Sequence, residues 1–242
     1  MREQEMTDET ATGTAGVEQP PSLFPDYRST VLRAPRQPLV AIPRTLTETT
    51  GPADCWDRLM GSALADLTAQ HKGPPLGQRI IVSGRVLDEF NKPVPNTVVE
   101  VWQANAAGRY IHKRDDWDAP LDPNFTGAGR AITDAEGRYR FITIRPGAYP
   151  WRNHHNAWRP AHIHFSLLGP AFSTRLITQM YFPDDPLIDL DPIANSVPMP
   201  YRQRLVSRFD LATTEPNWAL GYLFDIVLRG PDAIPMEENH DR

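Results

Sequence analysis

The chain has 242 residues, with 25 Lys and Arg against 30 Asp and Glu, so its formal net charge at pH 7 is −5. A mildly acidic balance argues against a general nucleic-acid binder, which needs clustered positive charge. The single cysteine, Cys55, excludes an intrachain disulfide framework. Because the sequence also shows neither a bilayer-spanning apolar run nor the apolar core of a secretory signal, we expect a cytoplasmic protein.

The proline content predicts a loop-rich β protein. The sequence contains 25 prolines and 15 glycines, and the proline share of about 10% is twice the usual value of about 5%. Long helices are therefore not expected, and loops must account for much of the chain.

The N-terminal third of the chain differs in composition from the rest. Residues 1–21 are polar and lack aromatic residues, so we expect a mobile tail that cannot bury enough apolar surface to become ordered. Residues 22–78 are expected to form a proline-rich extended arm followed by a short helical segment at Trp56–Gln70, where apolar residues recur at helical spacing. Tyr201–Phe209 is the second helix candidate.

Residues 79–232 change to the two-residue alternation of β-strands, and residues 233–242 are expected to be a C-terminal tail. Six segments separated by Gly, Pro, Asn and Asp are predicted strands: Arg79–Leu87, Thr97–Trp102, Arg138–Ile144, Ala161–Leu168, Arg175–Phe182 and Gly221–Leu228. We expect the first two to be neighbours. The pattern predicts an all-β fold, an antiparallel β-sandwich or barrel, rather than a parallel α/β sheet.

The segment Tyr149–Phe165, YPWRNHHNAWRPAHIHF, concentrates chemistry-bearing side chains and holds four of the seven histidines. On a strand, His162 and His164 share one face while Ile163 and Phe165 face the core. Two adjacent imidazoles suit a metal, although the same pattern also occurs on a solvated strand face. The neighbouring pair His154–His155 is not expected to bind one.

Further ligands for such a metal cannot be chosen from spacing alone. Zinc would need a third histidine or a carboxylate, and ferrous dioxygenases use two histidines and one carboxylate. The carboxylates of residues 132–137, ITDAEG, are better explained by a turn. The remaining donors are Tyr110 and Tyr149, each of which taken alone could equally be a half-buried aromatic residue.

Four stretches together carry a family resemblance: VEVWQANAAGRY, TDAEGRYRFITIRPGAYPWRN, WRPAHIHF and RLITQMYF. From about residue 25 to 230 the chain resembles the intradiol ring-cleaving dioxygenases. The resemblance implies a transthyretin-like antiparallel sandwich that holds a non-haem Fe(III) ion through Tyr110, Tyr149, His162 and His164. Two tyrosinates and one hydroxide would balance the three positive charges of such an ion, which avoids burying net charge.

The resemblance also implies roles for individual side chains. Tyr149 would be the tyrosinate that leaves the metal when substrate binds and then acts as a base. Arg159 would stabilise negative charge on the substrate ring, although a surface ion pair is its ordinary alternative. Gln179 would lie on the side of the site where O2 binds. The implied substrate-binding residues are Tyr27, Trp151, Tyr181 and Ile193, and Trp102 is either a pocket or a core residue.

Within this family, the enzymes that act on protocatechuate pair the iron-bearing subunit with a homologous α subunit that lacks the ligands, in a higher oligomer. The proline-rich arm favours this branch, because catechol and hydroxyquinol enzymes carry a helical N-terminal region. The implied reaction cleaves protocatechuate with O2 between its hydroxyl-bearing carbons. Two alternatives stay open: cleavage of catechol or hydroxyquinol, and a non-catalytic transthyretin-like binding module without iron.

Overall fold

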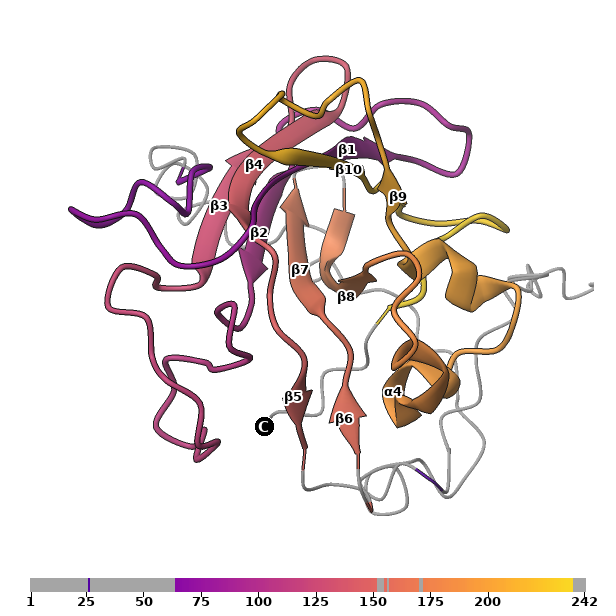
Figure 1. Ribbon diagram of the computed structural model, residues 1–242. Helices are drawn as coiled ribbons and strands as arrows, with labels where there is room; N and C mark the ends of the chain where they lie inside the picture. Colours follow the sequence, from indigo (N-terminus) through magenta and orange to yellow (C-terminus); the bar gives the residue numbers. More distant parts are fainter. Residues whose placement is uncertain (1–25, 27–63, 152–154, 156, 170–171, 237–242) are drawn as a thin grey trace, which may run out of the picture.

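A computed structural model describes residue 26 and residues 64–151, 155, 157–169 and 172–236. Within these residues the strands form two main sheets and a small hairpin (Figure 1). The strands are β1 (Arg79–Leu87), β2 (Val98–Trp102), β3 (Ala128–Ile132), β4 (Arg138–Ile144), β5 (Tyr149–Pro150), β6 (Trp158–Arg159), β7 (His162–Gly169), β8 (Phe172–Tyr181), β9 (Arg208–Phe209), β10 (Leu220–Leu223) and β11 (Ile226–Val227). The helical turns are η2 (Ile188–Leu190), α4 (Pro192–Asn195) and η3 (Tyr201–Leu205).

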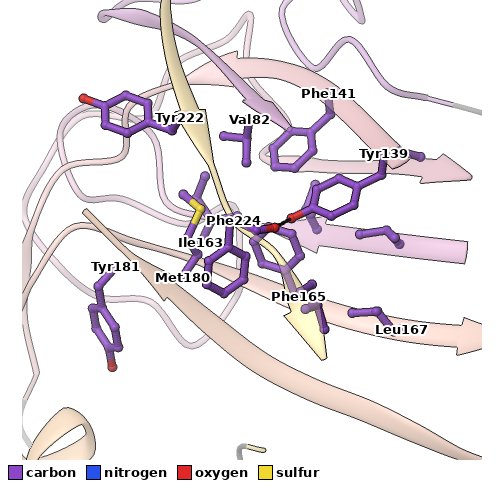
Figure 2. Packing of buried hydrophobic residues seen from close by; sticks show 14 of the residues in the cluster. Val82, Tyr139, Phe141, Ile163, Phe165, Leu167, Met180, Tyr181, Tyr222 and Phe224 are labelled. Atoms are coloured by element: carbon purple, nitrogen blue, oxygen red, sulfur yellow. Dashed lines mark hydrogen bonds between the residues drawn. The ribbon is translucent and has the colours of Figure 1, made fainter. Parts of the chain in front are cut away.

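The core lies between the two sheets. One sheet follows the order β11-β1-β10-β9, with β4 also paired to β1, and the other follows β3-β2-β7-β8. Phe165 of β7 packs with its ring 5.8 Å from Phe141 of β4 and 5.1 Å from Phe224, so side chains of both sheets meet in one cluster (Figure 2). This arrangement confirms the predicted β-sandwich.

The alternation of β7 shows why the sequence adopts this packing. Ile163, Phe165 and Leu167 point into the cluster and are fully buried, as the two-residue period predicts for Ile163 and Phe165. Tyr181 lies at the border of the cluster with its hydroxyl directed away from the other labelled side chains (Figure 2). The opposite face of β7 therefore lies outside this apolar cluster and is available for a functional site.

The strands lie where the sequence predicted them, but the predicted pairing of the first two strands is wrong. The bounds of β1 and β4 match the prediction, Gly221–Leu228 divides into β10 and β11, and β3 was not predicted. The expected pairing of Thr97–Trp102 with β1 is wrong, because β2 pairs with β3 and β7, while β1 pairs with β4 and runs parallel to β10 and β11. Pro93 and Pro95 lack a backbone N–H, so the ladder with β1 ends there and the chain crosses to the other sheet.

The helix predictions are largely wrong where they can be compared. Residues 56–63 lie outside the described residues, but Leu64 and Asp66 form β-bridges to Arg130 and Ile142, so 64–70 is not helical. These residues find backbone partners on the sheets, and Leu67 fills the space above Gly129, where a side chain would collide with it. For Tyr201–Phe209, a 3₁₀ turn ends at Leu205 and the chain continues into β9.

The described part of the C-terminal segment packs onto the sandwich. Ile234 is buried and donates its backbone N–H to Val227, and Pro235 accepts the Thr178 hydroxyl. In the described part of the chain no helix is long and apolar enough to cross a membrane. The predicted tail 1–21 and most of the arm lie outside the described residues.

Candidate active site

The outward face of β7 gathers polar side chains through strand register. Residues directly opposite each other in antiparallel strands share a face. His164 is opposite Trp102 of β2 and Gln179 of β8, and His162 is opposite Tyr181. The register therefore places both histidines, Gln179 and Tyr181 on one side of the sheet, with the Trp102 ring stacked on His164 at 4.7 Å.

Two loops bring the tyrosines to this face. The turn that follows β2 is organised by Asn105, whose side-chain oxygen accepts the N–H groups of Ala107 and Arg109. Gly108 has φ +79 and lies so close to Ala148 that a side chain there would collide with the Ala148 carbonyl. This close approach brings the rings of Tyr110 and Tyr149 into edge contact at 5.4 Å.

The donor atoms of the site converge at short range. His162 Nε2 lies 3.2 Å from His164 Nε2 and 3.4 Å from the Tyr149 hydroxyl. His162 Nδ1 lies 2.7 Å from the Pro160 carbonyl, to which it donates, so its Nε2 carries the lone pair. Burial lowers the pKa of His162 well below its ordinary value, and the positive charge of Arg159 and the neighbouring His164 add to this effect. A neutral imidazole is the form that binds a metal.

These residues fit a hard, highly charged cation. Because metal–ligand bonds to nitrogen and oxygen are about 2.0–2.2 Å long, donor atoms 3.2 and 3.4 Å apart are close enough to bind one ion together. Among the described residues no group of three or more His, Cys, Asp and Glu side chains could hold a metal. Beyond the two histidines the neighbouring donors are therefore phenols, and anionic phenolate oxygen is a hard ligand suited to a hard cation.

Arg159 lies at the end of this face in a buried network. Its backbone pairs with Tyr149 across the β5–β6 hairpin, and its Nε lies 3.2 Å from both carboxylate oxygens of Asp191. Its Nη2 donates to Gln179 Oε1 and, at 3.3 Å, to the Tyr181 hydroxyl. The surface ion pair considered for Arg159 is therefore wrong, because Arg159 is 4% exposed and Asp191 is fully buried.

Of the other predicted pocket residues, two lie at the network of Arg159 and Asp191, and one is outside the described residues. The ring of Trp151 lies 5.6 Å from the Arg159 guanidinium carbon, which places it beside the network. Ile193 joins the network through its backbone N–H, which donates to Asp191 Oδ1 at 3.2 Å. Tyr27 lies outside the described residues, and His155 is exposed.

Asp191 is the polar residue of this site that sequence reasoning missed. It is separated from Arg159 by 32 positions, and its sequence surroundings, DLDPIAN, carry only the signal of a helix N-cap before proline. It does cap α4, which lies beside β6 (Figure 1). No periodicity relates such a cap to a particular arginine, so the contact becomes visible only in the fold.

Comparisons with known proteins agree with this architecture. A family model described as "Dioxygenase" matches residues 51–230, and one described as "Protocatechuate 3,4-dioxygenase beta subunit N terminal" matches residues 15–45. The protocatechuate 3,4-dioxygenase beta chain of Burkholderia cepacia is 62% identical over 220 residues, which cover 90% of this chain and 93% of the relative. The alpha chain from the same organism is 30% identical over 159 residues, 64% of this chain and 75% of the relative.

A solved structure shows the same fold. Catechol 1,2-dioxygenase from Acinetobacter sp. ADP1 superimposes with a TM-score of 0.53 at 26% identity over 73% of this chain. The match covers 60% of that enzyme. Since a family model covers most of the sequence and a relative is 62% identical over nearly its whole length, the chain belongs to the intradiol dioxygenases, a family of ring-cleaving enzymes.

Proposed function

We propose that the chain is the iron-bearing subunit of an enzyme that cleaves protocatechuate with O2 between the two hydroxyl-bearing carbons, giving 3-carboxy-cis,cis-muconate. The observation that supports this most directly is the convergence of the Tyr149 hydroxyl and two imidazoles, with donor atoms 3.2 and 3.4 Å apart, beside the Tyr110 ring, which lies 5.4 Å from that of Tyr149. The 62% identity to a protocatechuate 3,4-dioxygenase beta chain supports the choice of substrate.

The residues that would hold Fe(III) are Tyr110, Tyr149, His162 and His164. A ferric ion held there would act as a Lewis acid that the catechol chelates, and it would make the catechol ring reactive toward O2. The His162 tautomer supports this assignment, because the hydrogen bond to Pro160 leaves Nε2 as the donor atom. The Trp102 ring stacked on His164 restricts the orientation of the second imidazole.

Tyr149 would have a second role on the substrate, and the site residues that are not metal ligands would act on the substrate alone. Tyr149 would accept a proton from a substrate hydroxyl as the catechol binds. Arg159 would hold its positive charge beside the ring as negative charge develops, an effect that is strong because the guanidinium is buried. Gln179 would offer hydrogen bonds on the oxygen side, and Trp151 and Tyr181 would form walls of the pocket.

We further propose that the active form is a hetero-oligomer with a homologous α subunit. The chain is similar both to the beta and, more distantly, to the alpha chain of one such enzyme, so the two kinds of subunit share this fold. The α subunit, which would lack the iron-ligating residues, would then complete the pocket. Tyr27 belongs to the arm and remains a proposed contributor to substrate binding.

The test is co-expression of this chain with an α homologue, followed by size-exclusion chromatography, iron analysis and an oxygen-uptake assay. We expect about one ferric iron per chain, a red-brown colour from tyrosinate-to-iron charge transfer, and faster oxygen uptake with protocatechuate than with catechol or hydroxyquinol. Zinc or no metal in active protein would refute the iron assignment. Faster turnover of catechol or hydroxyquinol would favour the alternative substrate, and a colourless protein without oxygen uptake would favour a binding module.

A further inference from the structure

The geometry points to Asp191 as a positioning residue that fixes the active-site arginine and, through it, the orientation of the Gln179 amide. This inference rests on the proposed function of the site. Asp191 is fully buried, and its carboxylate accepts from Arg159 Nε, from the Tyr181 hydroxyl at 3.1 Å and from the Ile193 N–H at 3.2 Å. It therefore joins β6, β8 and α4 at one point.

The contact with Arg159 determines the direction of the whole guanidinium. Arg159 Nε lies 3.2 Å from each Asp191 oxygen, and the guanidinium is planar and rigid. Holding the Nε edge therefore sets the opposite edge, where Nη2 donates to Gln179 Oε1 and to the Tyr181 hydroxyl. Without the carboxylate, the buried guanidinium would lose its ionic partner and the contact that holds its Nε edge.

The same contact selects which end of the Gln179 amide is presented to the site. Because Gln179 Oε1 accepts from Arg159, the Nε2 donor points elsewhere, and it has no hydrogen-bond partner among the described residues although it is buried. Gln179 is opposite His164 in the β7–β8 register, so this donor belongs to the face that carries the proposed metal ligands. A buried donor left open in this way is ready to bind a ligand atom.

A purely structural role for Asp191 makes a different prediction, because Asp191 also caps α4 through the Ile193 N–H. Asn caps helices about as well as Asp. The D191N variant therefore keeps the cap and one acceptor oxygen but removes the charge that holds Arg159. If the cap were the whole role of Asp191, D191N would behave as wild type.

The experiment compares D191N, R159L and the double variant in the iron-loaded complex, with the exposed neighbour Asp189 as the matched control in D189N. We expect D191N to bind iron normally, to lose at least tenfold in kcat per iron, and to change the KM for protocatechuate by less than twofold, because the ligand set is untouched. D189N should match wild type. In the R159L background, adding D191N should change turnover by less than twofold, because Asp191 acts through Arg159.

Thermal unfolding of the iron-free protein gives a second readout that does not depend on activity. R159L alone leaves a buried carboxylate without its ionic partner, so R159L/D191N should unfold at a higher temperature than R159L. The D191E variant keeps the charge at a shifted position, so its kcat should lie below that of wild type and above that of D191N, and its loss relative to wild type serves as the test if D191N does not fold.

A kcat of D191N within twofold of wild type, multiplicative losses in the double variant, or a D191E kcat below that of D191N would overturn the inference. A wild-type complex without oxygen uptake on protocatechuate would instead refute the proposed function. The unfolding temperatures would then still decide whether Asp191 holds Arg159.

Discussion

Both faces of β7 are largely buried, but different forces stabilise them. On the inner face, Ile163 and Phe165 belong to the apolar core. On the outer face His162 is 1% exposed, and Gln179 opposite His164 is 3% exposed, yet both are polar. Apolar burial alone stabilises the first face, whereas the second depends on each polar group having a partner.

This difference indicates that the inner face mainly determines stability and that the outer face mainly determines catalytic activity. Removing atoms from the inner face leaves a cavity that close-packed neighbours cannot fill. Removing one member of the outer network leaves a charged or polar group without its partner and disturbs the geometry around the proposed metal. Substitutions on the inner face should therefore lower the free energy of unfolding, and conservative substitutions on the outer face should mainly lower turnover.

The largest expected effect is Phe165→Ala on the inner face. The ring is fully buried between Phe224 and Phe141, so its loss should lower the free energy of unfolding by about 3–5 kcal/mol. Denaturant unfolding measures this. Phe90, which is 73% exposed, is the matched control, and Phe90→Ala should change stability by less than about 0.5 kcal/mol. Equal losses for the two variants would contradict the assignment of the core.

Arg159→Leu on the outer face should leave iron and colour in place and remove most of the turnover. By analogy with donors that stabilise developing negative charge, we expect kcat to fall about 10²–10³-fold, equivalent to about 3–4 kcal/mol. Visible spectra and oxygen uptake per iron measure the two properties separately. Turnover within a few-fold of wild type would reduce Arg159 to a structural partner of Asp191.

Tyr110→Phe should have a smaller effect on turnover but the clearest effect on the spectrum. The substitution keeps the ring that packs against Tyr149 and removes the phenol oxygen proposed as a ligand. We expect the charge-transfer band to weaken or shift, with activity at least about tenfold lower, the minimum loss typical of perturbing a metal's surroundings. An unchanged spectrum would remove Tyr110 from the ligand set.

The sequence predicted the parts of the site that depend on local periodicity. The alternation through β7 correctly placed Ile163 and Phe165 in the core, and therefore His162 and His164 on the other face. The partners across strands could not be derived in this way, because the register that places Gln179 opposite His164 depends on long-range pairing. The family resemblance supplied Gln179 as an expectation.

The errors also have a physical pattern. Helical spacing at Trp56–Gln70 predicted a helix, but the backbone of Leu64–Leu67 bonds to β3 and β4, and this tertiary pairing overrides local propensity. Asp191 gave only a capping signal, and its contact with Arg159 arises because α4 lies beside β6 (Figure 1).

The smallest expected effect comes from an exposed ion pair with the same kind of chemistry as Arg159–Asp191. Arg140 Nη2 lies 3.0 Å from Glu215 Oε1, but the two side chains are 50% and 52% exposed. Water and salt screen such a pair, and ordering two long side chains offsets most of the attraction, so exposed pairs contribute about 0–1 kcal/mol. Glu215→Gln should therefore change the free energy of unfolding by less than about 1 kcal/mol and leave turnover unchanged. Denaturant unfolding at low and high salt measures the first property, and oxygen uptake per iron, measured beside D191N, makes the comparison of turnover direct. A Glu215→Gln loss of turnover as large as that of D191N would show that burial does not distinguish the two pairs, and the argument for a special role of Asp191 would fail with it.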